Sequence, residues 1–225
     1  MPVAQRASHP ERVQPRAAGP FEARGPVARL AAFHAEAQDT ARLASLLGRS
    51  IHAAVALIAM GMGVLIFAGA ISAENMAWSG FVLVGASAIA LARRRTIKQP
   101  FERAALKSFS EDLNAIMALA GTAWGAGAFL AVPADAGIAA IVLFAAGACA
   151  VIALLLREHE SSLHFLAPTA ALASFACVLR PFPGGALAAA LVLLACGAVA
   201  IIAVSAARWS ARAHNSTELA ALPFS

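Results

Sequence analysis

The residues best able to do chemistry in this sequence stand together in the polar stretch 157–164. Glu158, His159, Glu160 and His164 carry carboxylate and imidazole groups, which bind divalent metal ions. Two histidines that share one face of a helix lie three or four positions apart in the sequence. His159 and His164 are five residues apart, so their rings would point to different faces. The spacing therefore favours a solvated link between two apolar segments over a metal site, and we expect no metal ion and no other cofactor.

The rest of the sequence contains no recognisable catalytic pattern. A nucleophile elbow, a phosphate-binding loop and a dinucleotide-binding fingerprint are all missing from it. The 18 residues after position 207 are too few for a catalytic domain. We therefore expect a protein that is not an enzyme.

The composition indicates that the residues of the polar stretch lie between membrane-spanning helices. Hydrophobic residues make up 60% of the chain and charged residues 13%, compared with roughly 25% charged residues in soluble domains. The mean hydropathy is +0.75. Six apolar stretches approach the ~20 residues that cross a ~30 Å hydrocarbon layer as a helix. They are 51–71, 76–92, 113–133, 137–156, 165–179 and 186–207.

These stretches predict an all-α, polytopic membrane protein whose transmembrane domain, residues 51–207, is a six-helix bundle. The second and fifth stretches are short, with 17 and 15 residues. A thin local bilayer or burial among neighbouring helices would accommodate them.

The basic residues predict the orientation of the bundle, because cationic loops stay on the cytoplasmic side of a membrane. The segment 93–112, read as a loop, holds six of the 17 Lys and Arg residues: Arg93, Arg94, Arg95, Lys98, Arg103 and Lys107. With the N-terminus inside, 16 of the 17 lie on the cytoplasmic side, and only Arg180 lies outside. We expect a bacterial inner-membrane protein with both termini in the cytoplasm. Five spans, without 165–179, would instead place Arg208 and Arg212 outside.

The net charge of +5 is also explained by this distribution. The basic residues flank the apolar stretches, where an anionic lipid leaflet is their natural neighbour. We therefore expect the lipid bilayer, and no nucleic acid, as the partner of the positive charge.

The residues that precede the first span divide into two parts. Residues 1–26 contain five prolines and no apolar period, which predicts a disordered cytoplasmic tail. Leucines and Phe33 recur at helical spacing in residues 27–50, which predicts an amphipathic helix. This helix would lie in the membrane interface or pack on a partner. We expect residues 208–225 to form a short cytoplasmic tail, and we expect no cleavable signal peptide.

Charged residues are absent from the central part of all six stretches. Such residues usually mark ion paths and proton relays, so their absence argues against a proton-coupled pump or a channel with a charged filter. A carrier of neutral solutes is still compatible with the sequence. Asn114 is the strongly polar residue within a span, and Ser110, Glu111 and Asp112 precede it. This order predicts the N-terminus of a helix.

Small residues and tryptophans suggest how the helices pack. Gly121 and Gly125 form a GxxxG pattern, which lets two helices approach closely, either at a dimer seam or within one bundle. Trp78 and Trp209 are expected to be anchors at the membrane interface, whereas Trp124 lies deeper and is expected to pack between helices or line a pocket. The cysteines are expected to be small packing residues without disulfides: Cys149, Cys177 and Cys196.

Several of these features together resemble a bacterial membrane sensor module. They are Trp78 at the start of the second span, three arginines (93–95) at its end, the motif GTAWGAGAFLAVP at 121–133, and Pro168 in the fifth span. Modules of this kind precede GGDEF diguanylate cyclase domains and some histidine kinase domains. The GGDEF signature itself is absent here, so the chain is either a stand-alone module or a truncated relative.

The resemblance implies a non-enzymatic sensory or anchoring module in bacterial signal transduction. Its expected partners are a separate cytoplasmic signalling protein and a second copy of the chain, with which it could form a homodimer. The residues that it marks as structural or as lining a ligand pocket are Trp78, Gly121, Trp124, Gly125, Pro133 and Pro168. The alternative is a small transporter or permease for a neutral or apolar solute.

Overall fold

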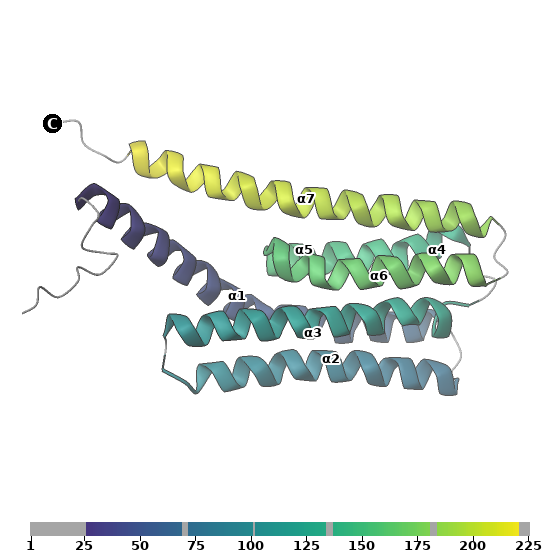
Figure 1. Ribbon diagram of the computed structural model, residues 1–225. Coiled ribbons are helices and arrows are strands. Elements are labelled where there is room, and N and C mark those ends of the chain that lie inside the picture. The colour runs from purple at the N-terminus through teal and green to yellow at the C-terminus, as the bar shows by residue number, and fades with distance from the viewer. Residues whose placement is uncertain (1–25, 69–71, 101, 134–136, 181–183, 221–225) are drawn as a thin grey trace, which may run out of the picture. The chain divides into compact units, whose positions relative to one another are not determined.

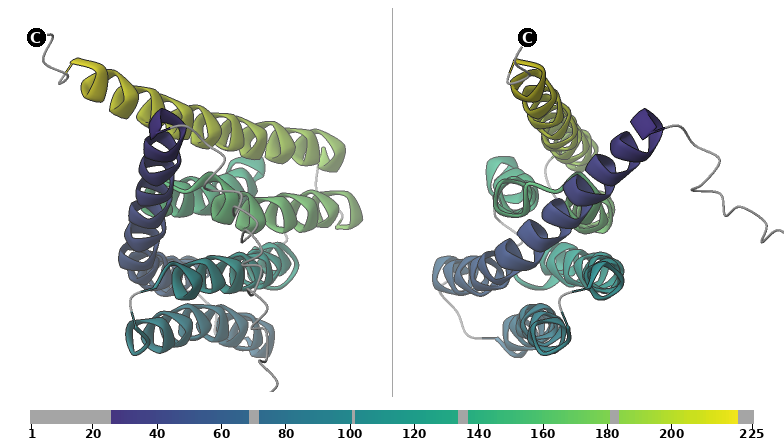
Figure 2. Two further views of the ribbon diagram at one scale, coloured as in Figure 1. Left: turned by 60° about the vertical axis from the view of Figure 1, so that its left-hand side comes forward. Right: turned by 90° about the vertical axis from the view of Figure 1, so that its left-hand side faces the viewer.

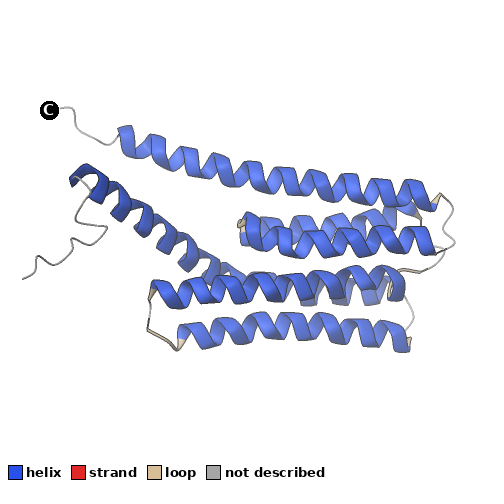
Figure 3. Cartoon of the chain, in the orientation of Figure 1, coloured by secondary structure: helices blue, strands red, loops and turns tan. Residues whose placement is uncertain are grey.

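The computed structural model describes residues 26–68, 72–100, 102–133, 137–180 and 184–220, and for 26–27 and 207–220 it describes the backbone alone. Every regular element in these ranges is a helix (Figure 3). Apart from Pro26, the predicted disordered tail 1–26 lies outside the described residues. The prediction of an all-α chain is confirmed for the part that the structure describes.

Eight helical elements follow one another in the described part of the chain (Figure 1). They are α1 (Pro26–Ala68), α2 (Ala73–Ile97), α3 (Arg103–Leu130), α4 (Ile138–Val142), the π-helix η1 (Leu143–Gly147), α5 (Ala148–Leu156), α6 (His159–Leu179) and α7 (Gly185–Ala220). The elements α4, η1 and α5 are continuous and form one span.

Within the described ranges, six helical segments are long and apolar enough to cross a membrane. They correspond one for one to the six stretches predicted from hydropathy, which fits a multi-pass membrane protein. The second and fifth helices contain 25 and 21 residues, so neither needs a thin bilayer. The expectation that these two spans are short is therefore wrong.

The chain divides into two compact units, residues 1–39 and residues 40–225. The first unit contains the beginning of α1, where Leu30 and Phe33 are exposed. The second unit contains the bundle and begins earlier than the predicted boundary at residue 51. Leu43, Leu46 and Leu47, assigned to an amphipathic helix outside the bundle, are buried in the core of this second unit.

The basic segment 93–112 is mostly helical, so its prediction as a loop is wrong. Helix α2 continues to Ile97, and α3 begins at Arg103. Arg94 and Arg95 lie in the last turn of α2, where positive charge complements the helix dipole. Pro100 lies in the short link and has no backbone N–H with which to continue the helix. The buried residues of α3 already begin at Leu106, before the purely apolar stretch.

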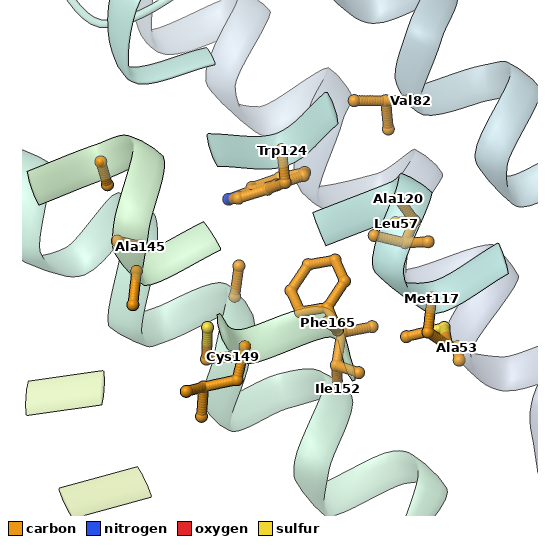
Figure 4. Packing of buried hydrophobic residues seen from close by; sticks show 14 of the residues in the cluster. Ala53, Leu57, Val82, Met117, Ala120, Trp124, Ala145, Cys149, Ile152 and Phe165 are labelled. Carbon is orange, nitrogen blue, oxygen red and sulfur yellow. The ribbon is translucent and has the colours of Figure 1, made fainter. Parts of the chain in front are cut away.

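Helices α3 and α6 form the centre of the second unit. Helix α3 packs against α2 and against α6, and α6 packs against α7 (Figures 1 and 2). The core between these helices is closely filled, with Trp124 and Met117 of α3 and Phe165 of α6 among its buried side chains (Figure 4). A polar group in this core needs a hydrogen-bond partner on its own helix or on a neighbouring one.

Candidate functional site

The seam between α3 and α6 depends on two glycines. A Cβ atom at Gly121 would collide with the backbone of Phe165, and one at Gly125 would lie 2.8 Å from Leu172 Cβ and 3.1 Å from the carbonyl oxygen of Pro168. Thr169 Oγ1 donates a hydrogen bond to the carbonyl of Gly121 at 3.0 Å. The face of the GxxxG pattern is therefore occupied by α6. Within the chain, these glycines therefore pack against a helix of the same bundle.

Three aromatic rings from α2, α3 and η1 form a cluster near one end of this seam. Trp78 and Trp124 are buried and lie edge to face, with ring centroids 5.5 Å apart. The ring of Phe144 stacks on that of Trp124 at 5.2 Å. Gly127 leaves room for the cluster, since a Cβ there would lie 2.5 Å from Trp78 Nε1 and 2.7 Å from Phe144 Cζ. We call Trp78, Trp124 and Phe144 the aromatic cluster.

Both indole groups of the aromatic cluster have hydrogen-bond partners. Trp78 Nε1 donates to the carbonyl oxygen of Ala123, and Trp124 Nε1 donates to that of Phe144, each at 2.9 Å. Trp78 is completely buried, so its prediction as a membrane-interface anchor is wrong. The side chain of Trp209, the other predicted anchor, lies outside the described residues.

The π-helix gives the aromatic cluster its third ring. A π-helical turn inside an α-helix is rare and frequently occurs at functional sites. Here it spans Leu143–Gly147 and presents both the ring and the carbonyl group of Phe144 to Trp124. Nothing in the apolar sequence of this span distinguishes the π-helical turn from the α-helix on either side.

An apolar groove of about 360 Å³ lies beside the aromatic cluster, between α1, α3 and the span formed by α4, η1 and α5. Trp124 and Phe144 line it, and so do Phe67 and Leu143, residues that are 76% and 70% exposed. We call it the lateral groove. Its remaining lining residues are Met60, Gly63, Val64, Ala131, Val132, Pro133, Ala140, Gly147 and Ala148.

The structure assigns the six residues that the sequence marked for packing or ligand binding to three neighbouring places. Trp124 and Pro133 line the lateral groove. Trp78 belongs to the aromatic cluster behind it. Gly121, Gly125 and Pro168 belong to the seam between α3 and α6, where Pro168 lies inside α6. These residues therefore form neighbouring parts of one packed region, of which the groove is one face.

An ion pair with one buried member lies where α5 meets α6. The Glu158 side chain is only 5% exposed, and its Oε1 accepts a hydrogen bond from Nη2 of Arg42 in α1 at 2.7 Å. His159 Nδ1 lies 3.5 Å from the same oxygen. The link itself is short, and Arg157 adopts the left-handed conformation with φ of 50°, which costs free energy in a non-glycine residue.

The prediction of a solvated link at 157–164 is therefore wrong for Glu158. Helix α6 already begins at His159, where only Arg157 and Glu158 separate it from α5. His159 and His164 are exposed, and His164 Nδ1 lies 2.8 Å from the carbonyl oxygen of Glu160. In the described ranges, no three His, Cys, Asp or Glu residues are placed to hold a metal ion.

Two further polar contacts join the helices. Asn114 lies inside α3, where its Oδ1 accepts a hydrogen bond from Ser161 Oγ at 2.6 Å, so the predicted helix N-terminus at this point is wrong. Arg180 Nη1 donates to the carbonyl oxygens of Ala128 and Val132 at the end of α3. A cation at a helix C-terminus satisfies carbonyls that the helix itself leaves unpaired.

The three cysteines are buried and have free thiols, as expected for small packing residues. No protein-family model, curated protein or solved structure matches this chain. Its function is therefore inferred from the sequence and from the geometry of the groove and the helix contacts.

Proposed function

We propose that this chain is a non-enzymatic sensory or anchoring module of the bacterial inner membrane, which acts on a separate cytoplasmic signalling protein. The resemblance to modules that precede diguanylate cyclase domains supports this proposal. The six apolar helices and the cationic end of the bundle are compatible with it. Arg94, Arg95, Lys98, Arg103 and Lys107 are exposed at that end, as side chains that face an aqueous compartment would be.

The observation that carries the proposal is the continuity of α1. This one helix lines the lateral groove with Met60 and Phe67 and forms the ion pair with Glu158 through Arg42. Further towards its N-terminus it carries the exposed Leu30 and Phe33. The residues of this one helix therefore contribute both to the groove and to an exposed apolar surface.

A signal requires that a ligand bind two packings of the bundle with different affinities, because only differential binding shifts their populations. The lateral groove is a surface at which such a difference can arise, since it is shared by three spans. The pair Arg42–Glu158 joins α1 to the turn between α5 and α6. A shift of these helices would strain or break this contact and so alter α1.

Crosslinking in native membranes tests the proposal. A photo-crosslinking residue in place of Ala37, which is exposed, should capture a protein with a cyclase, kinase or other output domain. Replacement of the exposed pair Leu30 and Phe33 by glutamate should abolish the capture. The matched control replaces Ala31 and Ala35, also exposed on this helix, by glutamate and should retain it.

The opposite outcome favours transport. If the chain is recovered alone, and if liposomes containing only this protein take up a neutral solute, the sensory function is wrong. The lateral groove would then be part of a solute path.

A further inference from the structure

The lateral groove opens towards the surroundings of the bundle. It lies between helices that are long enough to cross a membrane, and it includes the highly exposed side chains of Phe67 and Leu143. In a bilayer, the medium at this position is hydrocarbon, provided that these helices span it. A molecule that enters the groove therefore comes sideways from the lipid.

The chemistry of the lining restricts the ligand. Every lining side chain is apolar except for the indole of Trp124, and this indole N–H already donates to the carbonyl of Phe144 at 2.9 Å. A polar group in the groove would give up its hydration or hydrogen bonds without gaining a side-chain partner there. The lining therefore selects a plain hydrocarbon chain over a ligand that must form hydrogen bonds.

Packing forces determine which hydrocarbon occupies the groove. The hydrophobic effect does not drive association within lipid, where helices and ligands bind through van der Waals contacts. The walls of an empty groove lose these contacts, and any chain that fits restores them. Phospholipid acyl chains are the hydrocarbon that the bilayer itself supplies in the largest amount.

We propose that the lateral groove holds one acyl chain of a membrane phospholipid as a resident ligand, in contact with Trp124 and Phe144. Its volume of about 360 Å³ falls in the range of small-ligand sites. The chain completes the packing between α1 and the π-helix. This inference does not depend on the sensory function, because a transporter or an anchor with the same groove would hold the same chain.

Tryptophan fluorescence provides the test. The protein with the substitution Trp209→Phe retains Trp78, which does not line the groove, and Trp124, which does. In vesicles of phospholipid with brominated acyl chains, bromine in the groove should quench Trp124. The result is expressed for each variant as the ratio of its fluorescence in brominated and in ordinary vesicles.

A plug in the groove identifies the site of quenching. Gly63 lines the groove and has no neighbouring atom within 4 Å of a built Cβ, so Gly63→Phe can fill the space. Gly197 of α7 has equally open surroundings but does not line the groove, so Gly197→Phe is the matched control. Gly147→Leu, from the opposite wall, replaces the first plug if Gly63→Phe does not fold.

We expect quenching in the parent protein and in Gly197→Phe, and clearly weaker quenching, with a fluorescence ratio closer to one, in the plugged variant. Native mass spectrometry should detect one retained phospholipid in the parent and none in the plugged variant. Equal quenching in the plugged variant and the control would overturn the proposal, and so would no quenching in the parent. A retained molecule with the mass of a quinone or another isoprenoid would also overturn it.

Discussion

Glu158 is a carboxylate that the fold buries and that depends on a cation from elsewhere in the chain. Its Oε1 contacts Arg42, whereas its Oε2 has no hydrogen-bond partner. Removal of one member of a buried ion pair usually destabilises a protein more than the intact pair stabilises it, because a charge remains buried and uncompensated. The effect here is smaller than in a fully buried pair, since the Arg42 side chain is 49% exposed.

Arg42→Ala should lower the free energy of unfolding by about 1–3 kcal/mol, the usual cost of a buried polar group left unsatisfied. Thermal unfolding in detergent measures the effect as a lower Tm. The control is Lys107→Ala, which removes an exposed cation and should change Tm little. Adding Glu158→Gln to Arg42→Ala should recover part of the loss. If Arg42→Ala and Lys107→Ala unfold at the same temperature, the ion pair contributes nothing.

Gly121 permits a close approach of α3 to α6. A methyl group at this position would collide with the backbone of Phe165, which is less able to move than the end of a side chain. Gly121→Ala should therefore destabilise the protein by about 1–3 kcal/mol through overpacking. Gly48→Ala in α1 is the control, because a Cβ there meets no atom within 4 Å and alanine favours helix. A Tm of Gly121→Ala equal to or above that of the parent would show that α3 and α6 are not in this contact.

At the level of the helices, hydropathy was sufficient to locate the six spans, since each contains a long apolar run. It did not locate their ends. Leu106 and Phe109 continue the buried face of α3 through part of the segment whose basic residues suggested a loop. The period of the buried residues, every third or fourth position, is the signal that finds this extension.

The contacts between helices were harder to predict than the helices. The pair Arg42–Glu158 joins residues 116 positions apart, and no local pattern indicates it. Trp78 lies near the start of a span, which is where an interface anchor is expected, but the fold covers it with Trp124 and Phe144. The GxxxG pattern correctly indicated a close helix contact, although it could not indicate which helix is the neighbour.

For the molecule as a whole, the distribution of basic residues predicts which end of the bundle faces the cytoplasm. A single added cysteine tests this, because the three native cysteines are buried. In intact cells, Glu74→Cys at the start of α2 should react with a membrane-impermeant maleimide. Lys98→Cys, at the other end of the same helix, should react only after the membrane is permeabilised. Both side chains are exposed, so the reverse pattern would show that the orientation is inverted.

The central proposal for the whole molecule is that the groove and the exposed N-terminal part of α1 are coupled. The most direct measurement is the yield of crosslinking from position 37 to the cytoplasmic partner, in native membranes, for the parent, Gly63→Phe and Gly197→Phe. We expect the plug at Gly63 to change the yield and the control at Gly197 to leave it unchanged. Equal yields in all three proteins would contradict the coupling, and the absence of an output protein from all three would contradict the sensory function itself.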